Sequence, residues 1–128
     1  METLRTVLLV AGGGALGTLA RWWVSLAGER LLPKGFPWGT LLVNVAGCLA
    51  IGLVYALIER RFPEGASWRP LLVTGFLGAF TTFSAFSWEA DGLLREGAFA
   101  RAGAYLVGSV AFGLIAVRAG VAIGRAVG

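Results

Sequence analysis

The sequence contains no histidine and only one cysteine, Cys48. A disulfide within the chain is therefore impossible, and the usual cysteine and histidine ligands of a zinc site are missing. Charged residues make up only 14% of the 128 residues, against about 25% in an average soluble domain. With no histidine, no cysteine pair and no phosphate-binding loop, the sequence does not predict an enzyme.

Apolar residues are abundant, at 57% of the chain, and the mean hydropathy is +0.78. This composition predicts an integral membrane protein, which we expect in the cytoplasmic (inner) membrane of a prokaryote. Most of the 20 glycines lie inside apolar runs, as is typical where transmembrane helices pack closely. The net charge of +4 comes from arginines scattered at the ends of these runs, a pattern that favours membrane flanks over nucleic-acid binding.

Four apolar runs predict four transmembrane helices in one all-α domain that covers residues 1–128. At about 1.5 Å per residue, the first three runs are long enough for a hydrocarbon core of about 30 Å. The fourth is shorter, and Arg118 can extend it because its long side chain reaches the headgroups. The predicted helices are approximately 6–28, 36–58, 70–94 and 101–125.

The third run contains a segment, residues 75–87, that is poorly suited to a continuous helix. It holds two glycines, four hydroxyl residues and four phenylalanines. Glycine costs a helix about 1 kcal/mol relative to alanine, and serine or threonine can divert backbone hydrogen bonds to side chains. We therefore expect a break in the third helix, which survives in lipid only where protein, an ion or a cavity satisfies the freed carbonyls.

A few polar or aromatic residues inside the runs each allow two interpretations. Arg21 either reaches the headgroups or draws an anion into a vestibule. Asn44, which shares a helix face with Thr40, either joins two helices by a hydrogen bond or lines a path for a polar solute. Phe83 and Phe86 are i, i+3 neighbours, and such rings most often pack in a core.

Three motifs, in order along the chain, resemble those of the Fluc family of fluoride channels, also called CrcB. They are Gly13 to Gly17 with the following Arg21, Gly39 to Gly47, and Gly75 to Ser87. The resemblance implies a fluoride-selective channel that passively exports fluoride and so lowers its cytoplasmic concentration. It also implies an antiparallel homodimer of dual topology, with two pores and a structural sodium ion at its centre.

The same resemblance implies roles for individual residues. The sodium ion is expected on the backbone carbonyls of Gly78 and Thr81, at the break in the third helix. The implied fluoride path consists of Arg21, Thr40, Asn44, Phe83, Ser84, Phe86, Tyr105 and Ser109. Without the resemblance, two of these residues, Tyr105 and Ser109, would be interpreted as forming hydrogen bonds between helices.

The distribution of basic residues bears on topology independently of these motifs. Because the bias of lysine and arginine sets the direction of insertion, a nearly balanced count predicts a weak preference and both orientations in one membrane. The side with the termini and the middle connection has six and the other side has five: Arg5, Arg60, Arg61, Arg69, Arg118 and Arg125 against Arg21, Arg30, Lys34, Arg95 and Arg101.

Two other classes of protein share part of this pattern. A small dual-topology, proton-coupled exporter would need a membrane-embedded carboxylate, but Glu89 and Asp91 are expected at the end of the third helix. A non-transporting helical assembly protein would explain the glycines and Asn44 as packing residues. It has no need of a polar, phenylalanine-rich third helix. The fluoride channel is therefore the preferred hypothesis.

Overall fold

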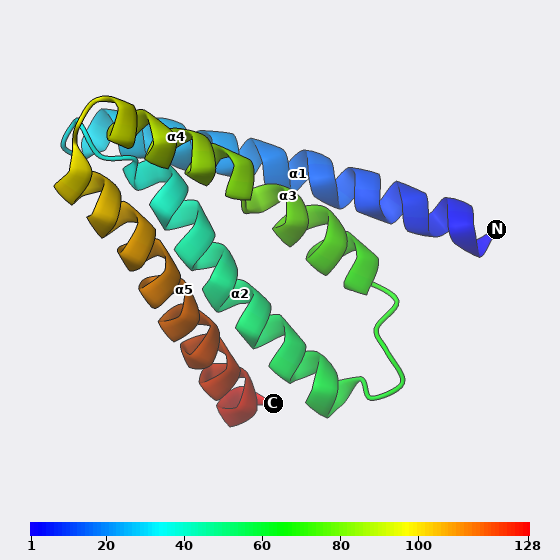
Figure 1. The fold of residues 1–128 in the computed structure, drawn as a ribbon. Coiled ribbons are helices and arrows are strands. Elements are labelled where there is room, and N and C mark those ends of the chain that lie inside the picture. Colours follow the sequence, from blue (N-terminus) through cyan, green and yellow to red (C-terminus); the bar gives the residue numbers. More distant parts are fainter.

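The computed structural model describes all 128 residues and is entirely helical outside short connections. Three helices are continuous: α1 (Glu2–Leu31), α2 (Trp38–Arg61) and α5 (Phe99–Val127). The third segment is divided into η1 (Pro70–Leu77), α3 (Gly78–Phe80) and α4 (Phe83–Arg95). Taken together as Pro70–Arg95, these pieces form the third of four segments that are long and apolar enough to cross a membrane. The predicted all-α fold with four such helices is confirmed (Figure 1).

The helices are longer than the sequence suggests. The first was expected over 6–28 but extends from Glu2 to Leu31, and the fourth was expected over 101–125 but extends from Phe99 to Val127. The predicted helix ends were placed where charged residues interrupt the apolar runs. Arginine and glutamate are good helix formers, so the backbone continues through them while their side chains remain exposed.

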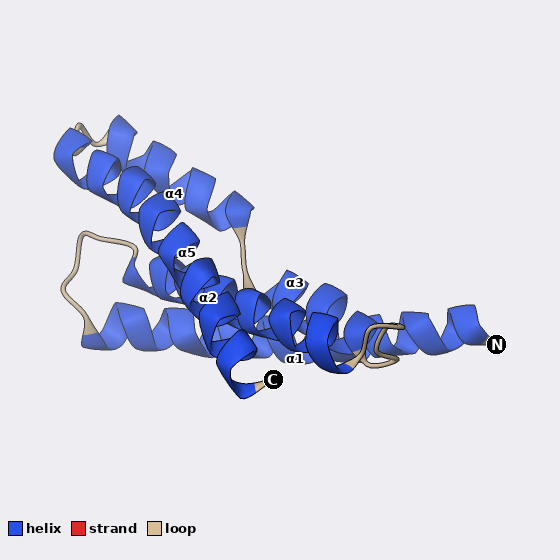
Figure 2. Cartoon of the chain, turned by 90° about the horizontal axis from the view of Figure 1, so that it is seen from below, coloured by secondary structure: helices blue, strands red, loops and turns tan.

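Successive long segments alternate in direction, as Figures 1 and 2 show. The connections 32–37 and 96–98 gather at one end of the molecule, here called the connection end. Both termini and the connection 62–69 lie at the other, where the helices spread apart; this is the terminal end. Helix α2 packs along α5, while α1 packs against η1 and α3. The break is therefore held between α1 on one side and α2 on the other.

Glycines allow these helix pairs to approach closely. A Cβ added at Gly17 would clash with the carbonyl group of Phe76 on η1. In the other pair, a Cβ added at Gly120 would clash with the carbonyl group of Leu49. Backbones at this separation leave no room for a side chain, so these glycines act in helix packing, as their position in apolar runs predicts.

The chain buries little of its apolar surface by itself. Only Val43 and Tyr105 are large side chains with no appreciable exposure. Tyr105 belongs to a small cluster near the connection end, with Ala90, Leu93 and Ala102. Large apolar side chains on α1 and α5 are exposed, which suits contact with lipid or with a second protein.

Candidate functional site

The third segment is interrupted by two extended residues, Thr81 and Thr82. Thr81 has φ −83° and ψ 156°, and Thr82 has φ −150° and ψ 118°. Their side chains terminate the helices on either side. The Thr81 hydroxyl donates to the carbonyl of Leu77 at 3.0 Å, and Thr82 Oγ1 accepts from the backbone N–H of Ala85 at 3.2 Å. Thr82 Oγ1 thus pairs an N–H at the start of α4, whereas the Thr81 hydroxyl adds a second donor to the Leu77 carbonyl, which already accepts from the N–H of Thr81.

The break lies later than the stretch from Gly78 to Thr81 implied by the resemblance. Gly78 has helical angles, φ −62° and ψ −36°. The segment before it, η1, has the wider turns of a π-helix, a rare geometry that is frequent at functional sites. Glycine permits a break but provides no alternative hydrogen bond. The hydroxyl of Thr82 does, because it accepts from the N–H of Ala85, and α4 begins directly after Thr82.

Asn44 of α2 holds the break through the backbone of one residue. Its Nδ2 donates to the carbonyl of Thr82 at 3.0 Å, and its Oδ1 accepts from the N–H of Thr82 at 2.8 Å. The amide therefore satisfies both backbone groups of an extended residue, as a neighbouring strand would. An amide nitrogen carries two hydrogens, so one N–H of Asn44 remains free to donate. Both sequence interpretations of Asn44 are compatible with this geometry.

Glu89 is a functional candidate that the sequence interpretation missed. It was expected at a helix end, but it lies inside α4, six residues before Arg95, and it is only half-exposed. Thr40 Oγ1 donates to its Oε1 at 2.8 Å, and the Tyr105 hydroxyl donates to its Oε2 at 2.7 Å. The hydroxyls of Thr40 and Tyr105 are thus engaged by a carboxylate and are not free donors.

The two phenylalanines of the implied path have different surroundings. Phe86 packs against the ring of Tyr105, with centroids 5.1 Å apart in an edge-on arrangement. Phe83 lies 5.7 Å from Phe86, but 79% of its surface is exposed. The rings are adjacent, as predicted, although only Phe86 packs in the interior of this chain. Phe83 projects from the break toward the outside.

The two serines of the implied path, Ser84 and Ser109, also differ in their surroundings. Ser84 is exposed, and its hydroxyl lies 3.4 Å from Thr82 Oγ1 beside the break. Ser109 on α5 has a buried hydroxyl with no hydrogen-bond partner. A buried unpaired hydroxyl is costly, so Ser109 has unused capacity for a polar ligand or water. No hydrogen bond joins it to Ser84 or to Asn44.

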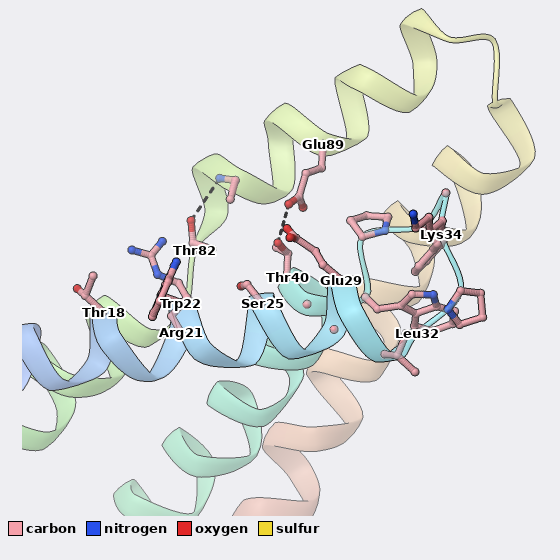
Figure 3. Close-up of a pocket in the computed structure, with 18 residues that line it drawn as sticks. Thr18, Arg21, Trp22, Ser25, Glu29, Leu32, Lys34, Thr40, Thr82 and Glu89 are labelled. Carbon is pink, nitrogen blue, oxygen red and sulfur yellow. Dashed lines mark hydrogen bonds between the residues drawn. The ribbon is translucent and has the colours of Figure 1, made fainter.

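Two cavities meet at Thr82. The larger, of about 670 Å³, lies at the connection end, and Figure 3 shows the residues around it. Its wall includes Arg21, Thr40 and Glu89. The smaller, of about 340 Å³, is lined by Asn44, Phe83, Gly78 and Thr81 among others. Thr82 lines both cavities, so the break separates two cavities that are lined by four of the eight predicted path residues, namely Arg21, Thr40, Asn44 and Phe83.

The larger cavity is polar without a strong excess of either charge. Arg21 and Lys34 line it, but so do Glu29 and Glu89. Arg21 makes no ion pair, because the single salt bridge of the chain joins Arg95 and Asp91 at 2.8 Å. An unpaired guanidinium on a cavity wall can attract an anion, as the vestibule interpretation of Arg21 requires.

Comparison with known proteins identifies the family. The profile of the CrcB-like protein family, described as Camphor Resistance (CrcB), matches residues 8–121. The chain belongs to the CrcB family. The fluoride-specific ion channel FluC of Rhizobium leguminosarum bv. trifolii is 52% identical over 119 residues, which cover 93% of this chain and 95% of the relative. The FluC protein of Paracoccus denitrificans is 52% identical over 120 residues, or 94% of each chain, and that of Solibacter usitatus is 45% identical over 118 residues, or 92% and 97%.

The match to CrcB proteins covers the whole candidate site. Residues 8–121 include most of α1 and α5, all of α2, and the broken third segment. The relatives carry names of ion channels and not of enzymes. With four helices able to cross a membrane, this CrcB protein is a multi-pass protein of a prokaryotic cytoplasmic membrane.

Proposed function

We propose that this chain is a fluoride-selective ion channel that lets fluoride leave the cytoplasm passively. The observation that carries the proposal is the 52% identity to a fluoride-specific channel over 93% of the chain, which includes the broken helix and both cavities. The geometry of the site suits this activity, because neutral donors and aromatic edges surround the break while the cation Arg21 stays at the larger cavity.

Fluoride is small and strongly hydrated, so a pore has to replace its water with hydrogen-bond donors. The free N–H of Asn44 and the hydroxyl of Ser84 are donors close to the break. The positive ring edges of Phe83 and Phe86 provide further weak contacts. Several weak contacts allow conduction, because an ion that is bound too tightly cannot leave.

Thr40 and Tyr105 have a different part in this proposal. Their hydroxyls donate to the two oxygens of Glu89, so they fix the carboxylate in the wall of the path. This arrangement keeps the Tyr105 ring against Phe86. We therefore assign them the positioning of Phe86 and Glu89, while Asn44 and Ser84 face the anion.

The direction of transport follows from the membrane potential. An inside-negative potential contributes about 2.3 kcal/mol per elementary charge for each 100 mV. A passive path for an anion therefore tends to expel fluoride without nucleotide hydrolysis. Arg21 at the larger cavity raises the local concentration of anions at one mouth.

The working unit in this proposal is an antiparallel homodimer. Phe83 has 79% of its surface exposed, and the smaller cavity beside it is open to the exterior of the chain. A second copy related by a two-fold axis would cover Phe83 and close this cavity. The balance of six basic residues against five on the two sides is compatible with insertion in both orientations.

The proposed dimer holds a structural sodium ion between the two breaks. Sodium is a hard cation that prefers oxygen ligands. The carbonyls of Gly78 and Thr81 accept no hydrogen bond within the chain, and both residues line the smaller cavity. Two unpaired carbonyls from each copy would supply four oxygens to a cation, which also removes the cost of leaving them unpaired in the membrane.

Fluoride release from liposomes tests the proposed activity. Vesicles that contain the purified protein and are loaded with equal fluoride and chloride are expected to release fluoride while they retain chloride, once a potassium ionophore balances the charge. The readout is the concentration of each anion outside the vesicles, with protein-free vesicles as the control. Equal release of both anions, or release of neither, would refute a fluoride-selective channel.

Replacement of sodium tests the proposed cation site. A ligand at about 100 times its Kd stabilises the protein by about 2.7 kcal/mol, so dimers in N-methylglucamine are expected to unfold at a lower temperature than dimers in sodium. Thermal unfolding at equal ionic strength measures the difference, and a potassium series shows whether it is specific. Coincident transitions in sodium and N-methylglucamine would argue against the site without affecting the fluoride assay.

A further inference from the structure

The ends of α2 and α5 meet at the terminal end in a corner of three arginines. Arg60 Nη1 donates to the carbonyl of Arg125, and Arg61 Nη2 donates to the carbonyl of Val127 at 2.9 Å. The last carbonyls of a helix have no partner within the helix, and cations near a C-terminus are favoured by the helix dipole. Two guanidinium groups of α2 therefore cap α5. We call Arg60, Arg61 and Arg125 the arginine corner.

Close packing fixes this corner. A Cβ added at Gly124 would lie 2.7 Å from the Cβ of Ala56, so the final turns of α5 rest directly on α2. The three arginines are exposed, and none forms an ion pair, because the single salt bridge of the chain lies at Asp91 and Arg95. The guanidinium groups of Arg60 and Arg61 are thus held on the last turn of α5, which carries Arg125, and no ion pair neutralises any of the three.

The corner retains most of its hydrogen-bonding capacity. A guanidinium has five N–H donors, and each of the two capping arginines uses one for a carbonyl. The caps restrict the conformations of these side chains before any ligand arrives, which reduces the entropic cost of binding. Planar, preorganised guanidinium groups are suited to bidentate contact with phosphate.

The location of the arginine corner favours a lipid headgroup over a free phosphate ion as its ligand. Helices α2 and α5 both end here after crossing the membrane, so the corner lies at the depth of the lipid headgroups. Ile123 and Val127, in the same turns of α5, are 46% and 59% exposed and can contact acyl chains. A free phosphate ion would use the guanidinium groups alone, whereas a lipid would use both features.

We infer that the arginine corner binds the headgroup phosphate of an anionic phospholipid at the junction of α2 and α5. Basic pockets between transmembrane helices recognise anionic headgroups by this chemistry. The negative charge of the bound lipid offsets part of this positive charge, and its phosphate holds the two helix ends together. The inference depends on the membrane location of the chain and not on fluoride conduction.

Lipid binding to the purified, detergent-solubilised full chain tests the inference by native mass spectrometry. Phosphatidylglycerol is titrated against phosphatidylcholine with the same acyl chains. Arg125→Gln keeps both caps, because these use the backbone carbonyls of residues 125 and 127, and we expect it to weaken phosphatidylglycerol binding about tenfold. Arg61→Gln is expected to have a similar effect. The matched control is Arg5→Gln, which removes one exposed charge from the same end and is expected to change binding less than about twofold.

Three outcomes would overturn the inference. Equal weakening by all three substitutions would indicate diffuse attraction instead of a site. Equal binding of phosphatidylglycerol and phosphatidylcholine would exclude selection for an anionic headgroup. Displacement of phosphatidylglycerol by inorganic phosphate at an equal concentration would identify a soluble anion site. Retention of the other bound lipids by Arg125→Gln, together with an unchanged unfolding temperature, verifies that the variant is folded.

Discussion

Asn44→Ala is expected to abolish fluoride release and to destabilise the dimer. The substitution removes both hydrogen bonds to the backbone of Thr82 and leaves an N–H and a C=O without partners at the break. Each unpaired buried group costs about 1–3 kcal/mol, so the break is expected to rearrange. The free N–H that Asn44 offers to the anion is lost at the same time. Fluoride release from liposomes and the temperature of thermal unfolding measure the two effects.

Cys48→Ala is the matched control for this substitution. Cys48 lies one turn further along α2 and lines the same smaller cavity, but its side chain makes no hydrogen bond. We expect it to keep most of the fluoride release and to lower the unfolding temperature only slightly. If Asn44→Ala behaved like Cys48→Ala in both assays, the amide would hold neither the break nor the anion.

The four long helices could be predicted because their signal is local. Membrane-length apolar runs identify a helix without any knowledge of its neighbours, since lipid requires every backbone group to be paired within the segment. The existence of the break was also predictable from the composition of residues 75–87. Its position was not, because it depends on which side chains replace the lost hydrogen bonds. Thr82 does so, with Asn44 from another helix.

Glu89 shows why part of the site could not be predicted. In the sequence it directly follows an apolar run, and its charge predicts the end of that run. The carboxylate becomes acceptable inside α4 because hydroxyls of two other helices, Thr40 on α2 and Tyr105 on α5, donate to its oxygens. Such compensation links residues that are far apart in the chain and leaves no local pattern. The sequence held one weak indication that Glu89 belongs to the site. Glu89 follows Phe86 by three residues and shares its helix face.

The helix pair formed by α1 and η1 provides the other large expected effect. Gly13→Ala is expected to disrupt this pair, because the new Cβ would clash with the carbonyl of Leu71 and lie 2.9 Å from the backbone nitrogen of Phe76. Neither group belongs to a flexible side chain, so the helices have to separate. Overpacking of this kind typically costs about 1–3 kcal/mol, and here it displaces the segment that leads into the break. A lower unfolding temperature and a loss of fluoride release are the expected results.

The adjacent glycine gives a control that differs by one position. A Cβ at Gly12 would meet no atom within 4 Å, and alanine is a better helix former than glycine by about 1 kcal/mol. Gly12→Ala is therefore expected to leave unfolding and release unchanged or to stabilise the chain. The comparison separates helix propensity from packing, because both substitutions improve propensity and only Gly13→Ala introduces a clash. Equal behaviour of the two variants would mean that α1 and η1 do not pack through Gly13.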